Sequence, residues 1–190
     1  MNILTDTLPT SLEINDVEYP IRSDFRTALK TIMAFEDNEL TGFEKQSILL
    51  GNIYEPLPLV FLQSALDKAN WFLNGGQISE EDTEDHQRLY SFSKDANFIF
   101  AAFRQTHGIN LQTADLHWWE FLALFMDLGS ETTFSSLIGL RKRVGDGTAT
   151  KEEKAAARAM GEMFEVPQVD TRTLDEKEKE AEFMRLIGGK

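Results

Sequence analysis

Histidine is the side chain best suited to acid–base and metal chemistry near neutral pH, and this chain has three of them. His86, His107 and His117 lie far apart, and no two of them share the i, i+4 spacing of a helical ligand pair. A zinc site needs three or four converging ligands, and the acidic residues around these histidines form no such motif. We expect no metal ion and no catalytic role here, and we expect His117 to hydrogen-bond locally at the start of a helix.

A short glycine-containing segment, Gly145-Asp146-Gly147-Thr148, is superficially similar to a phosphate-binding or calcium-binding loop. It lacks the Gly-Lys-Ser/Thr ending of the first and the spaced Asp/Asn ligands with a final Glu of the second. The chain has no G-x-S-x-G nucleophile elbow, and no pair of carboxylates stands out from its acidic background. We therefore predict neither an enzyme nor a cofactor. A deep pocket holding Glu120, Asp127 and His117 together would overturn that prediction.

The net charge of −13 over 190 residues limits the partners of this protein. Phosphate backbones and anionic membranes are bound by clustered Lys and Arg, so the sequence predicts neither nucleic acid nor membrane as a partner. The absence of cysteine excludes disulfides and thiolate chemistry, and it fits a reducing compartment. Met1 to Leu12 do not have the pattern of a secretory signal, and no apolar run is longer than Phe98 to Phe103, which is too short to span a membrane. These features predict a cytoplasmic protein.

The elements that must position these residues are mostly helical. Alternating apolar residues from Leu12 to Ile21 around Asn15-Asp16 predict a small β-hairpin. Amphipathic stripes and caps then predict seven helices, which begin near Ser23, Thr41, Pro58, Lys94, Asp115, Ser130 and Thr150. The predicted fold class is mainly α, a compact multi-helix bundle with the hairpin at its N-terminus. Residues 1–166 form the domain, and 167–190 form a charged C-terminal tail.

Several local features of these helices are specific enough to test. Thr41 with Glu44 and Thr150 with Glu153 predict capping boxes. The predicted buried stripes are Phe25, Leu29, Ile32 and Met33 in the first helix and Leu59, Leu62, Leu66 and Leu73 in the third. The basic triplet Arg141-Lys142-Arg143 is placed in a last helical turn, where it opposes the helix dipole. Ser79 to Asp85, with five acids, is either a solvated connector or the start of a polar helix.

Two clusters of large apolar residues are candidates for binding a partner. Trp118 and Trp119 lie side by side in a strongly aromatic helix, for which a core role is the default interpretation, although a Trp at the edge of the core can anchor a partner. The tail carries the second cluster, Phe183, Met184, Leu186 and Ile187. It is either a solvated terminus or a weakly docked helix that binds a partner or a neighbouring subunit.

Several motifs of this sequence resemble those of a family of bacteriophage proteins named for the fifteenth gene product of a siphophage. The motifs are Asp95-x-x-x-Ile99-x-x-x-Phe103, Gly108-Ile109-x-Leu111, Leu116-His117-Trp118-Trp119-x-Phe121, Thr133-Phe134 and Arg141. The similarity runs from the hairpin to about Arg143 and is weak after Gly145. The Leu-His-Trp-Trp-x-Phe core is its most specific part.

This resemblance implies a role in building long phage tails, because the genes of the family lie in the tail module. It implies a tail assembly chaperone in the host cytoplasm, encoded by a free phage or a prophage. Such a chaperone keeps the aggregation-prone tape-measure protein soluble until tail-tube protein polymerises around it. Its implied partners are the tape-measure protein and the tail-tube protein, and self-association is an open alternative. The rival hypothesis is a structural tail or connector subunit that is retained in the virion.

Overall fold

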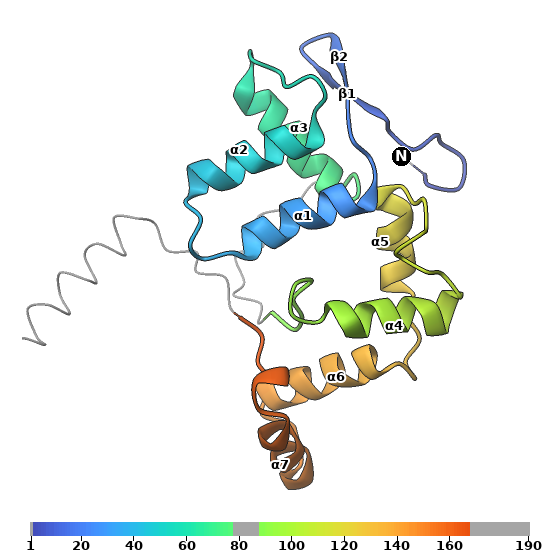
Figure 1. Cartoon of the computed structure of the whole chain (residues 1–190), viewed down its shortest axis with the longest axis vertical. Helices are drawn as coiled ribbons and strands as arrows, with labels where there is room; N and C mark the ends of the chain where they lie inside the picture. Colours follow the sequence, from blue (N-terminus) through green and yellow to red (C-terminus); the bar gives the residue numbers. More distant parts are fainter. Residues whose placement is uncertain (1, 78–87, 168–190) are drawn as a thin grey trace, which may run out of the picture.

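The architecture of the chain comes from a computed structural model, which describes residues 2–77 and 88–167 (Figure 1). Within this part, a two-stranded antiparallel sheet precedes seven α-helices and one short 3-10 helix. The elements are β1 (Ser11–Ile14), β2 (Val17–Pro20), α1 (Phe25–Glu36), α2 (Gly42–Ile53), α3 (Leu62–Leu73), α4 (Ala96–His107), α5 (Trp118–Met126), α6 (Thr133–Gly145), α7 (Lys151–Met160) and η1 (Gly161–Met163). The predicted fold class, mainly α with a small N-terminal hairpin, is confirmed. The acidic segment from Ser79 to Asp85 lies outside the described residues.

The hairpin forms at the predicted turn. Asn15 and Asp16 have φ of 49° and 62°, the left-handed values that a type I′ turn requires at both central positions. The register pairs Leu12 with Tyr19 and Ile14 with Val17, so the apolar side chains share one face. Leu12 and Ile14 on β1 are buried and β1 packs on α3, whereas Val17 at the turn is exposed.

Both predicted capping boxes are confirmed. The Glu44 carboxylate accepts a hydrogen bond from the Thr41 N–H at 2.8 Å, and the Glu153 carboxylate accepts one from the Thr150 N–H at 2.9 Å. These bonds satisfy N–H groups that have no partner inside the helix, and they are the leading cause of the lowered pKa of each glutamate.

The starts of three helices were predicted wrongly. α6 begins at Thr133, with Thr132 as its N-cap, rather than near Ser130. For α5 and α3 the reasons lie outside the helices. α5 begins at Trp118 with His117 as its N-cap, not near Asp115. The preceding chain is held extended, because the Trp118 N–H donates to the Ser23 carbonyl at 2.7 Å and the Phe25 N–H donates to the Leu116 carbonyl at 3.2 Å. The helix can therefore begin only after this pairing ends.

α3 begins at Leu62 rather than in the turn after Pro58. Pro58 is buried in the connection before the helix, and Phe61, the N-cap, has a left-handed φ of 55°. The buried face of α3 is formed by Ala65, Ala69 and Phe72, which replaces the predicted leucine stripe. Leu59 and Leu62 are exposed instead, because the helix starts after Leu59 and turns another face to the core.

The core is organised around α5, whose Phe121 is fully buried. The Phe121 ring stacks on Phe25 of α1 at 5.0 Å, on Phe103 of α4 at 4.9 Å and on Trp118 at 5.5 Å between centroids. In α1, the fully buried side chains are Phe25, Ala28 and Thr31, so only Phe25 of the predicted stripe is fully buried. The remainder of that stripe, Leu29, Ile32 and Met33, is half-buried or exposed because α1 packs on α2 and α5 through a neighbouring face.

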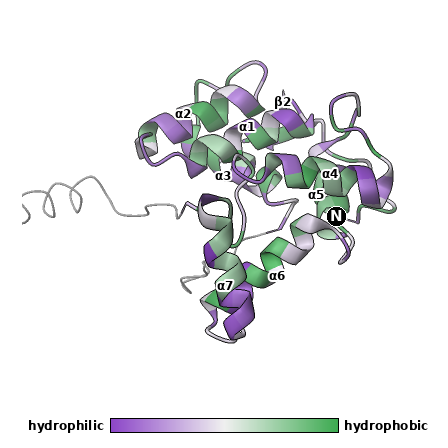
Figure 2. Ribbon diagram, turned by 60° about the horizontal axis from the view of Figure 1, so that its bottom comes forward, coloured by the Kyte–Doolittle hydropathy of each residue, from purple (hydrophilic) through white to green (hydrophobic). Residues whose placement is uncertain are grey.

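The last two helices form a layer of their own. α6 packs on α4, and α7 packs on α6 (Figure 1). Figure 2 shows α7 with hydrophilic residues along one side and hydrophobic ones along the other, as an amphipathic surface helix requires. None of the helices in the described ranges is long and apolar enough to cross a membrane.

Candidate functional site

The two tryptophans singled out in the sequence are part of the core. Trp118 and Trp119 are 1% and 5% exposed. Each indole N–H has a partner, since Trp118 donates to the Leu73 carbonyl at 2.9 Å and Trp119 to the Phe72 carbonyl at 2.8 Å. One edge of Trp119 lines a shallow pocket of 260 Å³ beside the exposed Met126. The other candidate anchors, Phe183, Met184, Leu186 and Ile187, lie outside the described residues.

The histidines that the structure describes have structural roles. His117 Nδ1 accepts a hydrogen bond from the Trp119 N–H at 3.0 Å, so Nε2 carries the proton and donates to the Pro9 carbonyl at 3.0 Å. The predicted local bond is confirmed, and the second bond fixes the segment before the hairpin on α5. His107 bonds through Nε2 to the Leu124 carbonyl at 2.9 Å. His86 lies outside the described ranges, within which no group of three or more His, Asp or Glu could hold a metal ion.

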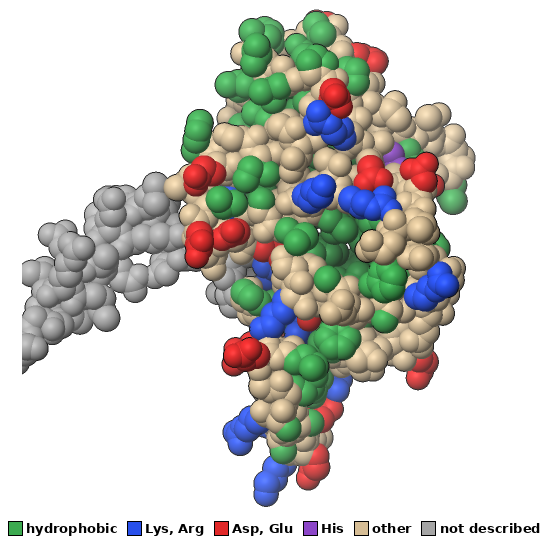
Figure 3. Space-filling model, in the orientation of Figure 1, with side chains coloured by type: hydrophobic (Ala, Val, Ile, Leu, Met, Phe, Trp, Pro, Cys, Tyr) green, Lys and Arg blue, Asp and Glu red, His purple; other side chains and the backbone are tan. Residues whose placement is uncertain are grey.

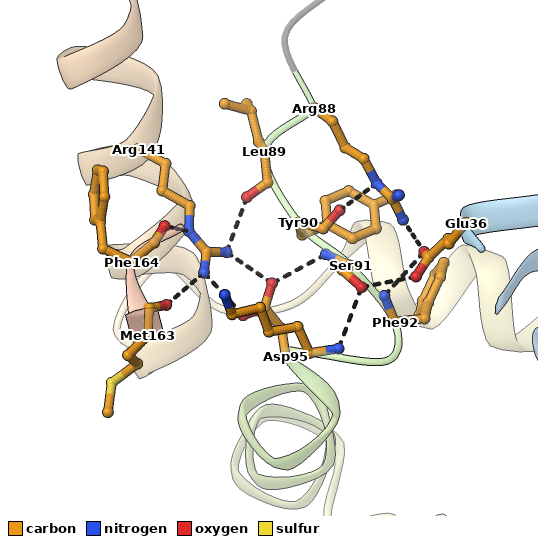
Figure 4. Close-up of polar contacts among 11 residues, drawn as sticks. Glu36, Arg88, Leu89, Tyr90, Ser91, Phe92, Asp95, Arg141, Met163 and Phe164 are labelled. Atoms are coloured by element: carbon orange, nitrogen blue, oxygen red, sulfur yellow. Dashed lines mark hydrogen bonds and ion pairs between the residues drawn. The ribbon is translucent and has the colours of Figure 1, made fainter. Parts of the chain in front are cut away.

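A buried ion pair between Asp95 and Arg141 forms the centre of a polar cluster inside the protein (Figure 4). The guanidinium donates to both carboxylate oxygens, at 2.7 and 3.0 Å, and the two side chains are 0% and 3% exposed. Its other N–H groups donate to the carbonyls of Phe164 at 2.8 Å, Met163 at 2.8 Å and Leu89 at 3.1 Å. All five donors of the guanidinium are therefore used, which satisfies the condition for keeping this charge buried.

The cluster continues through Ser91 to α1. The Ser91 N–H donates to Asp95 at 3.0 Å, and its hydroxyl donates to the Glu36 carboxylate at 2.7 Å. Glu36 also pairs with Arg88, whose Nε donates to the Tyr90 carbonyl at 2.8 Å. Burial lowers the pKa of Arg88 and raises the pKa of the Tyr90 phenol.

This network binds distant parts of the chain together. Asp95 precedes α4, Arg141 is on α6, Glu36 ends α1, and the accepting carbonyls at Met163 and Phe164 follow α7. The sequence pattern had placed Arg141 in the last turn of α6 beside Lys142 and Arg143, and the structure puts only Lys142 and Arg143 in that turn. Arg141 faces α4 instead, and its buried charge is neutralised by Asp95. Asp95 and Arg141 both occur in the motifs that resemble the bacteriophage family. That shared occurrence was the signal in the sequence that could have linked the two residues.

An exposed apolar segment, residues 57–62, lies at the α2–α3 connection. Leu57, Leu59, Val60, Phe61 and Leu62 are 43%, 80%, 56%, 57% and 50% exposed. Figure 3 shows hydrophobic side chains gathered at this end of the molecule. Runs of large apolar side chains in water mark interaction surfaces more often than isolated ones do.

The backbone on both sides of the exposed apolar segment is fixed. Before it, Tyr54 is buried and bridges to Ile21, and its hydroxyl donates to the Ala65 carbonyl at 2.8 Å. After it, the Ala65 N–H donates to the Phe61 carbonyl at 3.0 Å. Phe61 keeps a left-handed conformation that is unfavourable for a bulky residue, and no side chain caps this end of α3. The apolar side chains are thus held in solvent by an anchored loop.

The fold and its surfaces define a small, mainly helical protein with an N-terminal hairpin, an internal ion-pair clamp and an exposed apolar loop. The chain belongs to the Bacteriophage Gp15 protein family, whose model matches residues 4–166. The match includes the region after Gly145, where the sequence motifs showed only weak similarity. Membership makes this a bacteriophage protein of the structural or tail-related class. No curated protein and no solved structure matches the chain.

Proposed function

We propose that this protein is a phage tail assembly chaperone, which binds the tape-measure protein in the host cytoplasm and keeps it soluble until the tail tube forms. The observation that carries the proposal is the exposed apolar segment, residues 57–62, on a chain with a net charge of −13. A chaperone of this kind needs an apolar surface to cover its client and a charge that keeps the complex in solution. It needs no active site and no nucleotide.

The size of the exposed apolar segment fits reversible binding. Fully burying one Leu, Val or Phe contributes about 1.5–3 kcal/mol. The five side chains of the segment are 43–80% exposed, so burying what remains of them contributes less than the roughly 7.5–15 kcal/mol of five full burials. Association opposes this with at least about 4 kcal/mol of lost freedom, which leaves a moderate affinity. Tail-tube subunits that polymerise around the tape-measure protein then compete with the chaperone for the apolar surface of the tape-measure protein, and the chaperone is released.

Co-expression with the tape-measure protein tests the proposal. The wild-type chain should raise the soluble fraction of that protein and co-purify with it. The double substitution Leu59→Asp, Val60→Asp should reduce the co-purified amount at least about tenfold, because it places two charges in the apolar contact. A matched control is Leu4→Asp, at a leucine that is 88% exposed outside this segment, and it should bind like the wild type. Absence of a complex with the wild-type chain would sink the proposal.

A structural subunit of the tail or connector is the second candidate, which family membership also favours. The two functions differ in where the protein is found at the end of assembly. Mass spectrometry of purified virions should find the chaperone absent or strongly depleted. Stoichiometric recovery in virions would favour the structural subunit.

A further inference from the structure

A groove of 470 Å³ separates α1 from α4. Its walls include Leu29 and Met33 of α1 and Phe100 of α4, and Phe121 of the core closes its floor. Figure 3 shows a hollow lined with hydrophobic side chains between these helices, with Lys and Arg at its α1 edge. The aromatic side chains that the groove leaves open are the half-buried Phe92 and Phe100, which pack against the core.

The charged side chains that line the groove are positive, although the chain is strongly acidic. They are Arg26 and Lys30. Arg26 is already occupied, since it pairs with Asp24 at 3.0 Å and donates to the carbonyls of Leu111 and Ala114 at 2.8 and 2.9 Å. Lys30 is exposed and forms no ion pair with any residue in the described ranges. An occupant that complements this groove is apolar with an acidic flank.

We propose that the occupant is the C-terminal segment of the same chain, residues 176–187. At helical spacing, Phe183 and Ile187 fall on one stripe, and Glu176 and Glu180 extend that stripe by two turns. Phe183 and Ile187 fill the apolar groove, and one of the two glutamates pairs with Lys30. The segment covers the half-buried Phe92 and Phe100 in the groove.

The connecting chain is long enough for this contact. Sixteen residue steps separate Pro167, the last described residue, from Phe183. Extended chain covers up to about 3.3–3.6 Å per residue, so these steps span up to roughly 50 Å. A folded chain of this length has a radius of gyration of about 16 Å, so the segment can reach any face of its own domain.

The absence of cysteine from the chain permits a direct test by disulfide trapping in the full-length protein. The variant Asn97→Cys, Gly188→Cys places one thiol on the exposed α4 side of the groove and the other beside Ile187. Under mild oxidation it should form an intramolecular disulfide, because docking brings the two Cα atoms within bonding range. Adding Ile187→Asp should slow this reaction at least about tenfold, and Lys30→Glu should slow it up to about fivefold. Non-reducing electrophoresis and mass spectrometry measure the product.

Two further cysteine pairs decide whether the contact is specific. Lys151→Cys with Gly188→Cys tests an exposed site on α7, and Val60→Cys with Gly188→Cys tests the exposed apolar segment. Both should react at least about tenfold more slowly than the groove pair if the C-terminal segment docks as proposed. Equal rates at all three sites, faster trapping at Val60, or disulfides that join two chains would overturn the proposal. The test needs no partner protein, so its outcome is independent of the chaperone proposal.

Discussion

At the scale of single residues, Arg141 shows how an arginine, a residue type that usually lies on the surface, is accommodated inside the protein. A buried guanidinium is tolerated only when its charge is neutralised and its donors are filled. Asp95 supplies the charge, and three backbone carbonyls supply the remaining acceptors. Arginine suits this position because its planar fork reaches five acceptors, whereas the lysine ammonium has only three donors.

Removing one partner of this pair should destabilise the fold strongly. Asp95→Ala leaves the Arg141 charge buried without its counter-ion, so we expect a loss of about 3–5 kcal/mol in the free energy of unfolding, measured by urea denaturation. The double substitution Asp95→Leu, Arg141→Met should lower the free energy of unfolding by less than the sum of the losses for Asp95→Leu alone and Arg141→Met alone. Arg143→Gln, at a half-exposed ion pair, is the control and should lose less than about 1 kcal/mol. Additive effects of the double change would contradict this account of the pair.

Tyr54 predicts a loss of stability in alkali. Burial raises the pKa of its phenol above the ordinary value of 10.0, so the folded state keeps a proton that the unfolded chain releases. This contribution is complete below pH 10 and declines as pH rises from there toward the raised pKa. Denaturation curves between about pH 9 and 11 should show the decline, and Tyr54→Phe should flatten it. An unchanged slope in Tyr54→Phe would assign the effect to other groups.

At the scale of the elements, the residues at the helix ends determine how closely neighbouring helices approach. The glycine turn after α3 passes directly over α5, and a Cβ on Gly76 would lie 2.7 Å from Cη2 of the Trp119 ring. Gly76 also has a left-handed φ of 79°. Glycine is needed here for both the conformation and the close approach.

Gly76→Ala should therefore destabilise the protein by more than conformation alone explains. We expect about 1 kcal/mol from the positive φ and a further 1–3 kcal/mol or so from overpacking against Trp119, measured by thermal or urea denaturation. Gly108→Ala is the matched control, because Gly108 has φ of 70° and a Cβ added there would have no neighbour within 4 Å. Equal losses at the two positions would show that the contact with Trp119 is unimportant.

At the scale of the whole molecule, charge and apolar exposure work together. The net charge of −13 repels copies of the chain from one another, while residues 57–62 offer a surface through which copies can adhere. Solubility then depends on the ionisation of 32 Asp and Glu residues against 19 Lys and Arg.

Acidification should expose this balance. Carboxylates with pKa near 4 begin to take up protons below about pH 5, and the net charge of the chain passes through zero at its sequence pI of about 4.6, so we expect aggregation near that pH, measured by light scattering. Leu59→Ser, Val60→Ser, Leu62→Ser should aggregate markedly less. A control with Leu4→Ser, Phe43→Ser and Met126→Ser changes side chains that are at least as exposed and should behave like the wild type. If the control variant aggregates less than the variant of residues 57–62, a surface other than residues 57–62 causes the aggregation.

The sequence by itself determined the local structure of this protein. Asn15-Asp16 predicted the hairpin turn, and Thr41 and Thr150 predicted helix starts, because these depend on backbone preferences and on side chains only three residues away. The family was also indicated by the sequence, because its motifs are patterns along the chain. They include Asp95, the Leu-His-Trp-Trp-x-Phe motif and Arg141. The mainly helical fold class followed from the periodicity of the apolar residues.

Only the tertiary structure decided which surfaces are buried. The sequence placed Arg141 in the basic last turn of a helix, and only the packing of α6 on α4 buries it against Asp95. The sequence placed Leu59 in the core, and it is exposed because α3 begins after it and turns another face inward. His117, not Asp115, caps α5 because backbone pairing with Ser23 and Phe25 fixes where that helix can start. Contacts between residues distant in sequence set these outcomes, and their energies exceed the local preferences from which a sequence pattern is read.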